Sequence, residues 1–315
     1  MKFIGDFREG EQIAGVYLCR QKQTLVSKNG KNYDSLILQD KSGSIDTKIW
    51  DPSSPAIDDY DSMDYVFVNG EVTIYNSKPQ LKVSRLRKAS GNEYDPADYV
   101  PVSKRDVGEM YDALLNMIST VKNPYLSKLL ESFFVEDEAF IKAFKGHSAA
   151  KSVHHSFLGG LLQHTLMVAG HCDYFAKVYP VLNRDLLVTA ALCHDIGKTR
   201  ELSDFPLNDY TDEGQLLGHI VIGCEMVGER AARIESFPER LLVELKHCII
   251  AHHGEYEFGS PKKPALIEAL VLSYADNIDA KVEAVTEFFG NVREDDLSWL
   301  GYNKWVDSNI RRTGK

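Results

Sequence analysis

The sequence predicts an α+β protein of two domains, a small N-terminal β-barrel and a C-terminal helical bundle. Over the first ninety residues, apolar and polar residues alternate in short segments rich in β-branched and aromatic side chains, which is typical of strands. From about residue 105 onward, apolar residues recur at helical spacing. The 315 residues, 43% of them hydrophobic, are enough for about two domains. We therefore expect a barrel over residues 1–90, a linker and connecting helices over 91–148, and a helical domain over 149–315.

Five strands are expected in the barrel. Asn29-Gly30 suits a tight hairpin that needs positive φ angles, and Ser42-Gly43 and residues 76–79 mark two more turns. A polar segment, residues 51–64, separates the third strand from the fourth. The alternating segments are residues 13–18, 33–38, 44–50, 65–75 and 80–83, with the fourth counted as one long strand. Together these features resemble an OB-fold of the nucleic-acid-binding type.

The OB resemblance implies a surface for single strands, because such folds stack bases on exposed aromatic rings in a groove lined with cations. The candidates for stacking are Tyr17, Tyr33, Trp50, Phe67 and Tyr75. The candidates for phosphate contacts are Lys22, Lys28, Lys31, Lys48, Lys82, Arg85, Arg87 and Lys88. Two alternatives stay open: the aromatic residues could fill the barrel interior, and the basic segment 82–88 could be a solvated edge strand.

The segment after the barrel predicts a linker and two connecting helices. Residues 91–104 contain Gly91, Pro96 and Pro101, which is typical of a linker. Ser103 or Asp106 could cap a helix through residues 110–118, and a second helix is expected over 124–134, with Pro124 in its first turn. These helices bridge the two domains, and docking on a neighbouring subunit of a homo-oligomer stays open.

A series of His and Asp residues in the C-terminal half predicts a metal centre. The series is His164, His194-Asp195, His219, His252-His253 and Asp276, each in or beside a stretch with helical periodicity. Both residue types bind divalent cations, so distant helices could bring them to one centre. Any one of these histidines, taken alone, is more often a core residue. Mixed imidazole and carboxylate ligation suits Mn²⁺, Fe²⁺ or Co²⁺, leaves Zn²⁺ open and suits Mg²⁺ less.

The order and local sequence of these residues resemble the HD phosphohydrolase superfamily over about residues 150–290. The matching segments are Gly159-Gly160-Leu161-Leu162-Gln163-His164-Thr165, Leu192-Cys193-His194-Asp195-Ile196-Gly197-Lys198, Gly218-His219-Ile220 and Ala275-Asp276. The resemblance implies that one ion is bound by His164, His194, Asp195 and Asp276. It also implies that Asp195 bridges to a second ion, bound by His219 with His252 or His253.

The choice between His252 and His253 and the roles of Asp279 and the other histidines depend on their positions around this set. Consecutive helix residues point about 100° apart, so His252 and His253 can both reach metals only if their helix ends there, as Gly254 predicts. We favour His252 of the two and keep Asp279 as a reserve ligand. The others are His154 and His155, which either touch substrate or pack, and His147, His171 and His247, which we interpret as packing residues.

Two metal ions about 4 Å apart bind a phosphoryl oxygen and lower the pKa of a bridging water, which is the chemistry of phosphoester hydrolysis. Asp195 is therefore the central catalytic candidate. Lys198 follows it by one helical turn, where an ammonium could hold a nonbridging phosphate oxygen. The alternative for Lys198 is a surface residue near a helix end.

An OB-type barrel followed by an HD domain, with the segment His154-His155-Ser156-Phe157-Leu158-Gly159-Gly160, resembles the YhaM family of bacterial 3′-to-5′ exoribonucleases. The resemblance implies Mn²⁺-dependent shortening of single-stranded RNA, with some action on DNA. Two alternatives stay open. One is a phosphodiesterase of small nucleotides, although Gly254-Glu255-Tyr256 departs from the Gly-Tyr-Pro of the cyclic-dinucleotide class. The other is a non-enzymatic single-strand-binding factor with a structural metal.

Charge and composition limit the classes of partner that the protein can have. The net charge is −10, but residues 1–90 carry 13 Lys/Arg against 12 Asp/Glu, so the acidic excess belongs to the helical half. No segment reaches the roughly 18 apolar residues of a membrane span, and the N-terminus becomes charged too early for a signal peptide. Five widely separated cysteines indicate reduced thiols. We expect a cytoplasmic protein with no membrane partner.

Overall fold

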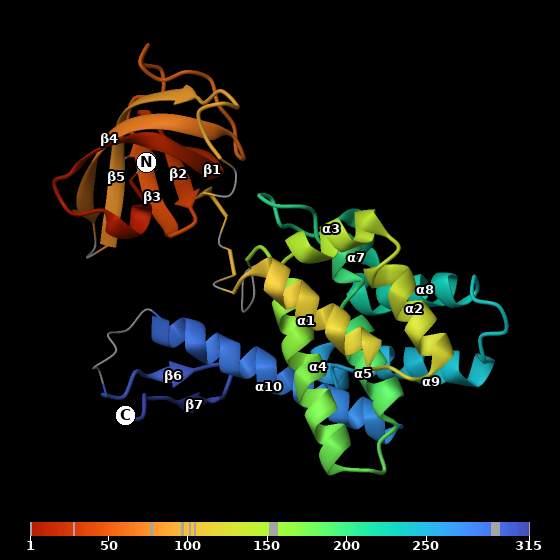
Figure 1. The fold of residues 1–315 in the computed structure, drawn as a ribbon. Helices are drawn as coiled ribbons and strands as arrows, with labels where there is room; N and C mark the ends of the chain where they lie inside the picture. The colour runs from red at the N-terminus through yellow and green to blue at the C-terminus, as the bar shows by residue number, and fades with distance from the viewer. Residues whose placement is uncertain are drawn as a thin grey trace. The chain divides into compact units, whose positions relative to one another are not determined.

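The computed structural model describes residues 2–27, 29–75, 78–95, 98–100, 102–103, 105–150, 157–290 and 297–314. The chain forms two compact units, Met1–Val102 and a second that comprises Ser103–Asp204 and Asn208–Lys315 (Figure 1). Several residues of the sequence-based predictions lie outside the described residues, namely Lys28, Asn76, Ser77, Pro96, Pro101, His154 and His155.

The first unit is the predicted five-stranded barrel. Its strands close in the order β1-β2-β3-β5-β4, with β3 and β5 parallel and the other neighbours antiparallel, which is an OB-type arrangement. A short 3-10 helix, Ile4–Asp6, precedes the barrel. The strands are β1 (Gln12–Val26), β2 (Asn32–Asp40), β3 (Gly43–Ile49), β4 (Tyr65–Tyr75) and β5 (Lys78–Lys88).

Two strands extend beyond their predicted ends. The second half of β1 is exposed or half-buried throughout, so it carries no alternation of burial that a sequence pattern could reveal. On β5 the pairing with β4 shifts between Asn69 and Gly70, where Ser84 is an extra residue, and this irregularity interrupts the period of two. A Cβ at Gly70 would lie 2.6 Å from the carbonyl oxygen of Lys82, so only glycine allows the strands to approach this closely.

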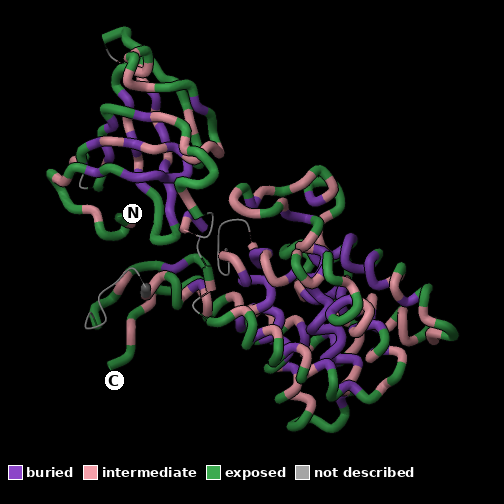
Figure 2. Tube along the Cα trace, turned by 45° about the horizontal axis from the view of Figure 1, so that its top comes forward, coloured by how far each residue is buried: buried purple, intermediate pink, exposed green. Residues whose placement is uncertain are grey.

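The barrel interior corrects one predicted stacking residue. Inward-facing side chains of all five strands form one core, and Figure 2 shows buried and exposed positions alternating along the strands. Tyr17 belongs to this core, is 1% exposed, and donates its hydroxyl hydrogen to the carbonyl oxygen of Lys2 at 2.8 Å. The prediction that Tyr17 stacks a base is therefore wrong, because its place in the strand alternation points it inward.

A second, smaller apolar cluster covers the outside of β1 and corrects another stacking residue. Val16, Leu18 and Tyr99 form its buried part, and the half-buried ring of Phe67 packs against them. The first half of β1 is thus buried on both faces, which the period-two interpretation did not allow for. Phe67 is a packing residue rather than an open platform for a base.

The second unit begins with three helices, each with a polar cap at its N-terminus. α1 (Val107–Ser119) is capped by Asp106, whose carboxylate accepts a hydrogen bond from the amide of Glu109. α2 (Pro124–Phe134) begins at the predicted proline and is capped by Asn123. α3 (Glu138–Gly146) is capped by Asp137. The connecting helices predicted from residues 110–118 and 124–134 are present.

Seven further α-helices, a 3-10 helix and a C-terminal hairpin complete the described part of the second unit. They pack around one large apolar core to which α2, α4, α5, α8 and α9 contribute most of their buried residues. The helices are α4 (Gly160–Val178), α5 (Arg184–Cys193), α6 (Lys198–Glu201), α7 (Asp212–Leu216), α8 (Gly218–Ala231), α9 (Glu239–Ile250), a 3-10 helix (Tyr256–Phe258) and α10 (Ile267–Gly290), and the hairpin consists of β6 (Tyr302–Asn303) and β7 (Ser308–Asn309). Among the described residues, none of the helices combines the length and apolar character needed to cross a lipid bilayer.

Candidate active site

The predicted metal ligands lie mostly at helix ends, where side chains and loops are free to converge. His164 is on α4 and Asp276 on α10, whereas His194 and Asp195 follow the last residue of α5. His219 is the second residue of α8. A Cβ at Gly197 would lie only 2.0 Å from the carbonyl oxygen of His219, so this glycine permits the close approach that brings the two segments together.

The first group of ligands is His164, His194 and Asp276, whose nitrogen and oxygen atoms all lie within 4.8 Å of one another. The Nε2 atoms of the two histidines are 3.2 Å apart, and Oδ1 of Asp276 lies 3.1 Å from Nε2 of His164. Both histidines are buried. Three donor atoms that face one point from three chain segments are what a metal site requires.

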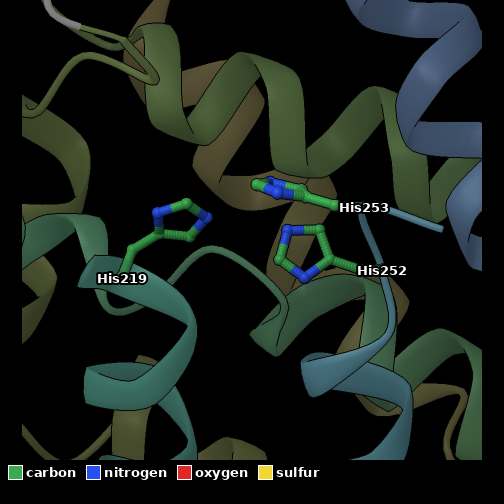
Figure 3. A group of neighbouring side chains, drawn as sticks. All are labelled: His219, His252 and His253. Carbon is green, nitrogen blue, oxygen red and sulfur yellow. The ribbon is translucent and has the colours of Figure 1, made fainter. Parts of the chain in front are cut away.

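The second group is His219, His252 and His253, again with ligand atoms within 4.8 Å of one another. Figure 3 shows the three imidazole rings turned toward a common centre. Both adjacent histidines take part because α9 ends at Ile250 and the chain turns at Gly254, which has a φ of +77°. His253, which we ranked second, thus lies in the same group as His252.

Asp195 lies between the two groups and directs one carboxylate oxygen at each. Its Oδ2 is 3.3 Å from Nε2 of His194 and 3.5 Å from Nε2 of His164. Its Oδ1 is 3.4 Å from Nε2 of His219 and 3.7 Å from Nε2 of His252. The side chain is 2% exposed. This is the arrangement of a carboxylate that bridges two ions.

The hydrogen bonding of these side chains fits a pair of divalent ions. Oδ1 of Asp195 and the Nε2 atoms of His219 and His252 are buried and have no hydrogen-bond partner in the described structure. Buried polar atoms without partners are costly, so three of them directed at one point fit the donor set of a cation site. The Nδ1 atoms of His194 and His252 lie 2.7 Å from the carbonyl oxygens of Ala191 and Ile249, which leaves each Nε2 available as a ligand.

Two carboxylates act on the ligands without joining either group. Oδ2 of Asp279 lies 2.7 Å from Nδ1 of His164, so the predicted reserve ligand is instead a hydrogen-bond partner of a candidate ligand. Oε1 of Glu201 lies 2.9 Å from Nδ1 of His219 and accepts a hydrogen bond from its backbone amide at 3.0 Å. Sequence reasoning missed Glu201, because no spacing rule connects a residue on α6 with the start of α8.

The charges at the centre reinforce this arrangement. Burial by itself raises the pKa of Asp195, but Lys198 and His194 outweigh it and hold that pKa well below its usual range. Burial lowers the pKa of His252 well below its usual range, and His253 and His194 add to the effect. A charged carboxylate beside a neutral imidazole is the protonation state that binds a metal ion.

Lys198 and Asp195 form a buried ion pair at the edge of the centre. Nζ of Lys198 lies 2.7 Å from Oδ2 of Asp195, and the lysine side chain is 15% exposed. Lys198 also lines a cavity of about 270 Å³. The lining of this cavity includes His164, Asp195, Lys198, His253 and Asp276 from the centre and Phe258, Ser273, Asn277 and Trp305 beyond it. The centre is therefore open to a ligand on one side.

On the barrel, Tyr33 and Trp50 form the most exposed aromatic pair. Their rings stack at 4.9 Å between centroids with 29° between planes, and Trp50 is 49% exposed. Tyr75, the last residue of β4, is 62% exposed. These three remain candidates for stacking after Tyr17 and Phe67 are removed.

Some of the side chains predicted to contact phosphates are unpaired among the described residues, and others already have a partner. Lys82 and Arg85 are exposed and form no ion pair with any described residue, and Lys82 pairs with Lys48 across β5 and β3. Arg87 is engaged, because its guanidinium holds both oxygens of Glu93 and lies 4.7 Å from the Phe67 ring. The other occupied cations are Lys22 on the Tyr60 carbonyl, Lys48 on Asp46 and Lys88 on Asp64. Arg87 is therefore already paired in this structure, and its contact with phosphate stays a prediction.

Comparisons with known proteins give one family match and two structural similarities. Residues 161–281 match the HD domain family. The barrel is similar to the second OB-fold domain of replication protein A from Methanococcus maripaludis, with 22% identity, a TM-score of 0.22, and coverage of 28% of this chain and 94% of that chain. A replication protein A heterotrimer bound to ssDNA matches with 20% identity, a TM-score of 0.20, and coverage of 28% and 64%. An HD domain implies a metal-dependent phosphohydrolase, and the two ligand groups fall within the matched residues.

Proposed function

Because the chain carries an HD domain, we propose that it is a 3′-to-5′ exoribonuclease that hydrolyses single-stranded RNA, and DNA as a secondary substrate, with two divalent ions. The observation that carries the proposal is the position of Asp195, with one oxygen directed at each group of ligands. The first ion would be held by His164, His194 and Asp276, and the second by His219, His252 and His253.

Mn²⁺ is the metal that we propose, with Co²⁺ or Fe²⁺ as alternatives. Five imidazoles and two carboxylates make a mixed nitrogen and oxygen donor set. Such a set suits these ions better than it suits Mg²⁺, which prefers oxygen ligands alone. Such an ion pair supplies Lewis-acid activation of the phosphoryl group and of a water molecule.

The residues around the ions position the strand. Lys198 binds a nonbridging oxygen of the scissile phosphodiester, since its ammonium faces the cavity next to Asp195. Asp195 keeps that ammonium charged, because their attraction outweighs the burial that would lower the lysine pKa. The cavity, about 270 Å³, is below the usual range of about 300–1,000 Å³ for ligand pockets, which favours the end of a chain over an interior segment.

The barrel would hold the rest of the strand. The stacked rings of the half-buried Tyr33 and the exposed Trp50 offer a surface for bases, and Lys82 and Arg85 offer free cations for phosphates. Weak binding there is sufficient, because tethering raises the effective concentration of the strand end at the metal centre. The 3′ polarity is supported by the resemblance of the segment up to His164 to the YhaM exoribonucleases.

Digestion of end-labelled RNA with Mn²⁺ tests the proposal. A 5′-labelled strand should shorten into a ladder, and a strand labelled at its 3′ end should release labelled mononucleotide at once. EDTA or Asp195→Asn should abolish both reactions while strand binding remains. Hydrolysis of free or cyclic dinucleotides without shortening of RNA would replace this function with that of a small-nucleotide phosphodiesterase.

A further inference from the structure

The C-terminal hairpin holds one tryptophan in a defined position. Trp305 lies in the turn between β6 and β7, and its backbone amide donates a hydrogen bond to Oδ1 of the buried Asn303 at 2.9 Å. Arg312 lies just after β7. It donates a hydrogen bond to the carbonyl oxygen of Phe289, and its guanidinium lies 5.1 Å from the centroid of the Phe289 ring. These contacts place the hairpin against the last part of α10 (Figure 1).

Trp305 lines the same cavity as the candidate metal ligands. Asp195, Lys198 and Asp276 line this cavity together with Trp305. Trp305 is 37% exposed, so packing covers only part of this residue. The faces of an indole ring bind other aromatic groups by stacking and offer no ligand atom to a metal ion. The place of Trp305 in the lining therefore favours an aromatic part of the substrate.

The segment that carries the hairpin, residues 297–315, is basic and complements a polyanion. Residues 297–315 contain Lys304, Arg311, Arg312 and Lys315 but only one acidic residue, Asp307, in a chain whose net charge is −10. Nζ of Lys304 lies 5.0 Å from the centroid of the Trp305 ring. A cation beside an aromatic ring is the combination with which proteins bind single-stranded nucleic acids, one binding phosphate and the other binding a base.

We propose that Trp305 is the platform on which the base of the 3′-terminal nucleotide stacks while its phosphodiester lies at Lys198 and the metal ligands. This inference rests on the proposed exonuclease function and names the part of the strand that the cavity recognises. Trp305 and Lys198 line one cavity of about 270 Å³, so the base that reaches Trp305 belongs to the nucleotide next to the phosphodiester at Lys198. Stacking of this kind accepts any of the four bases, because each has a π-face.

The proposal is tested by combining one change in the RNA with one change in the protein. RNA oligonucleotides with a normal or an abasic 3′-terminal nucleotide are compared on the wild-type protein and on Trp305→Ala. Removing the base should lower kcat/KM of the wild type by about 10-fold to 100-fold, the usual effect of losing one stacked base. On Trp305→Ala the same removal should change kcat/KM less than about 3-fold, because the platform is already absent. Equal base effects on both proteins would overturn the proposal.

Trp299→Ala is the matched control for the hairpin. Trp299 is 67% exposed and does not line the cavity, and its ring lies 5.3 Å from the Arg311 guanidinium. This variant should keep the full wild-type preference for a base at the 3′ end. Loss of that preference in Trp299→Ala as well would assign the effect to a disturbed hairpin and would count against Trp305 as the platform.

A binding measurement separates this inference from the proposed function. The last linkage of both oligonucleotides is replaced by a methylene-bridged phosphonate, which keeps its charge but cannot be hydrolysed. Fluorescence anisotropy with Mn²⁺ should show weaker binding of the abasic strand to the wild type and equal binding of both strands to Trp305→Ala. If the wild type shortens no RNA, the exonuclease function fails, yet this difference in Kd would still support the platform, and its absence would overturn it.

Discussion

Oδ2 of Asp279 lies 2.7 Å from Nδ1 of His164, one helical turn along α10 from the ligand Asp276. One helix thus provides both a metal ligand and the carboxylate that orients another ligand. Burial opposes protonation of His164, but hydrogen bonds to Asp276 and Asp279 outweigh it and raise the pKa of this imidazole to about 10. Asp279 accepts the proton on Nδ1, and the second proton of this cation is on Nε2, which is directed toward the centre, so a metal ion bound at Nε2 would displace that proton.

Replacing Asp279 with Asn should weaken binding of the first metal ion by about 10-fold to 100-fold, the usual cost of losing a carboxylate behind a ligating histidine. Asparagine keeps the size and an acceptor oxygen but removes the negative charge. Equilibrium dialysis with Mn²⁺ measures the change, and circular dichroism checks that the variant is folded. Unchanged affinity at both sites would show that Asp279 only packs.

Glu201→Gln should weaken binding of the second metal ion in the same way. Oε1 of Glu201 contacts both the ring and the backbone amide of His219, which belongs to the second group of ligands. The glutamine oxygen can still accept the amide hydrogen bond, so the helix start should persist. In a two-site titration, Glu201→Gln should weaken the second ion and Asp279→Asn the first. Equal effects of both variants on both ions would contradict two separate sites.

Lys198→Gln should lower kcat by about 10²-fold to 10³-fold, as expected when one donor to a charged transition state is removed. Because the Lys198 ammonium also pairs with Asp195, metal content is measured on the same preparation. Lys142→Gln, on the exposed side of α3, is the matched control and should behave like the wild type. Loss of both ions in Lys198→Gln would mean that the lysine supports the metal site and not the phosphate.

The residues that form the two candidate ligand groups could be predicted from the sequence, whereas their supporting contacts could not. The ligands occur as short motifs such as His194-Asp195, because each loop must present them in one local conformation. Glu201 and Trp305 have no such motif, and only tertiary packing brings α6 to α8 and the hairpin to the cavity. Tyr17 was misjudged because the first half of β1 is buried on both faces, so alternation could not separate the interior of the barrel from its surface.

Trp50→Ala should weaken binding of a single-stranded oligonucleotide by about 1–3 kcal/mol, or roughly 5-fold to 150-fold in Kd. Trp50 is about half exposed and its ring stacks on that of Tyr33. Its loss therefore removes one stacking surface for a base and takes away the ring that supports Tyr33. Tyr174→Ala, which removes an even more exposed aromatic residue from α4, should leave Kd unchanged. Equal losses from both substitutions would argue against a barrel surface for bases.

Lys82 and Arg85 should contribute to strand binding through their charge alone, so the salt dependence of Kd is the informative measurement. Each phosphate contact on a single strand adds about 0.7 to the slope of log Kd against log salt concentration, and the double variant Lys82→Gln, Arg85→Gln should therefore lower that slope by about 1.4. Lys88 is the matched control on the same strand, because its ammonium lies 2.8 Å from Oδ2 of Asp64 and is already paired. A slope that changes as much in Lys88→Gln as in the double variant would mean that general surface charge, rather than these two free cations, attracts the strand to the barrel.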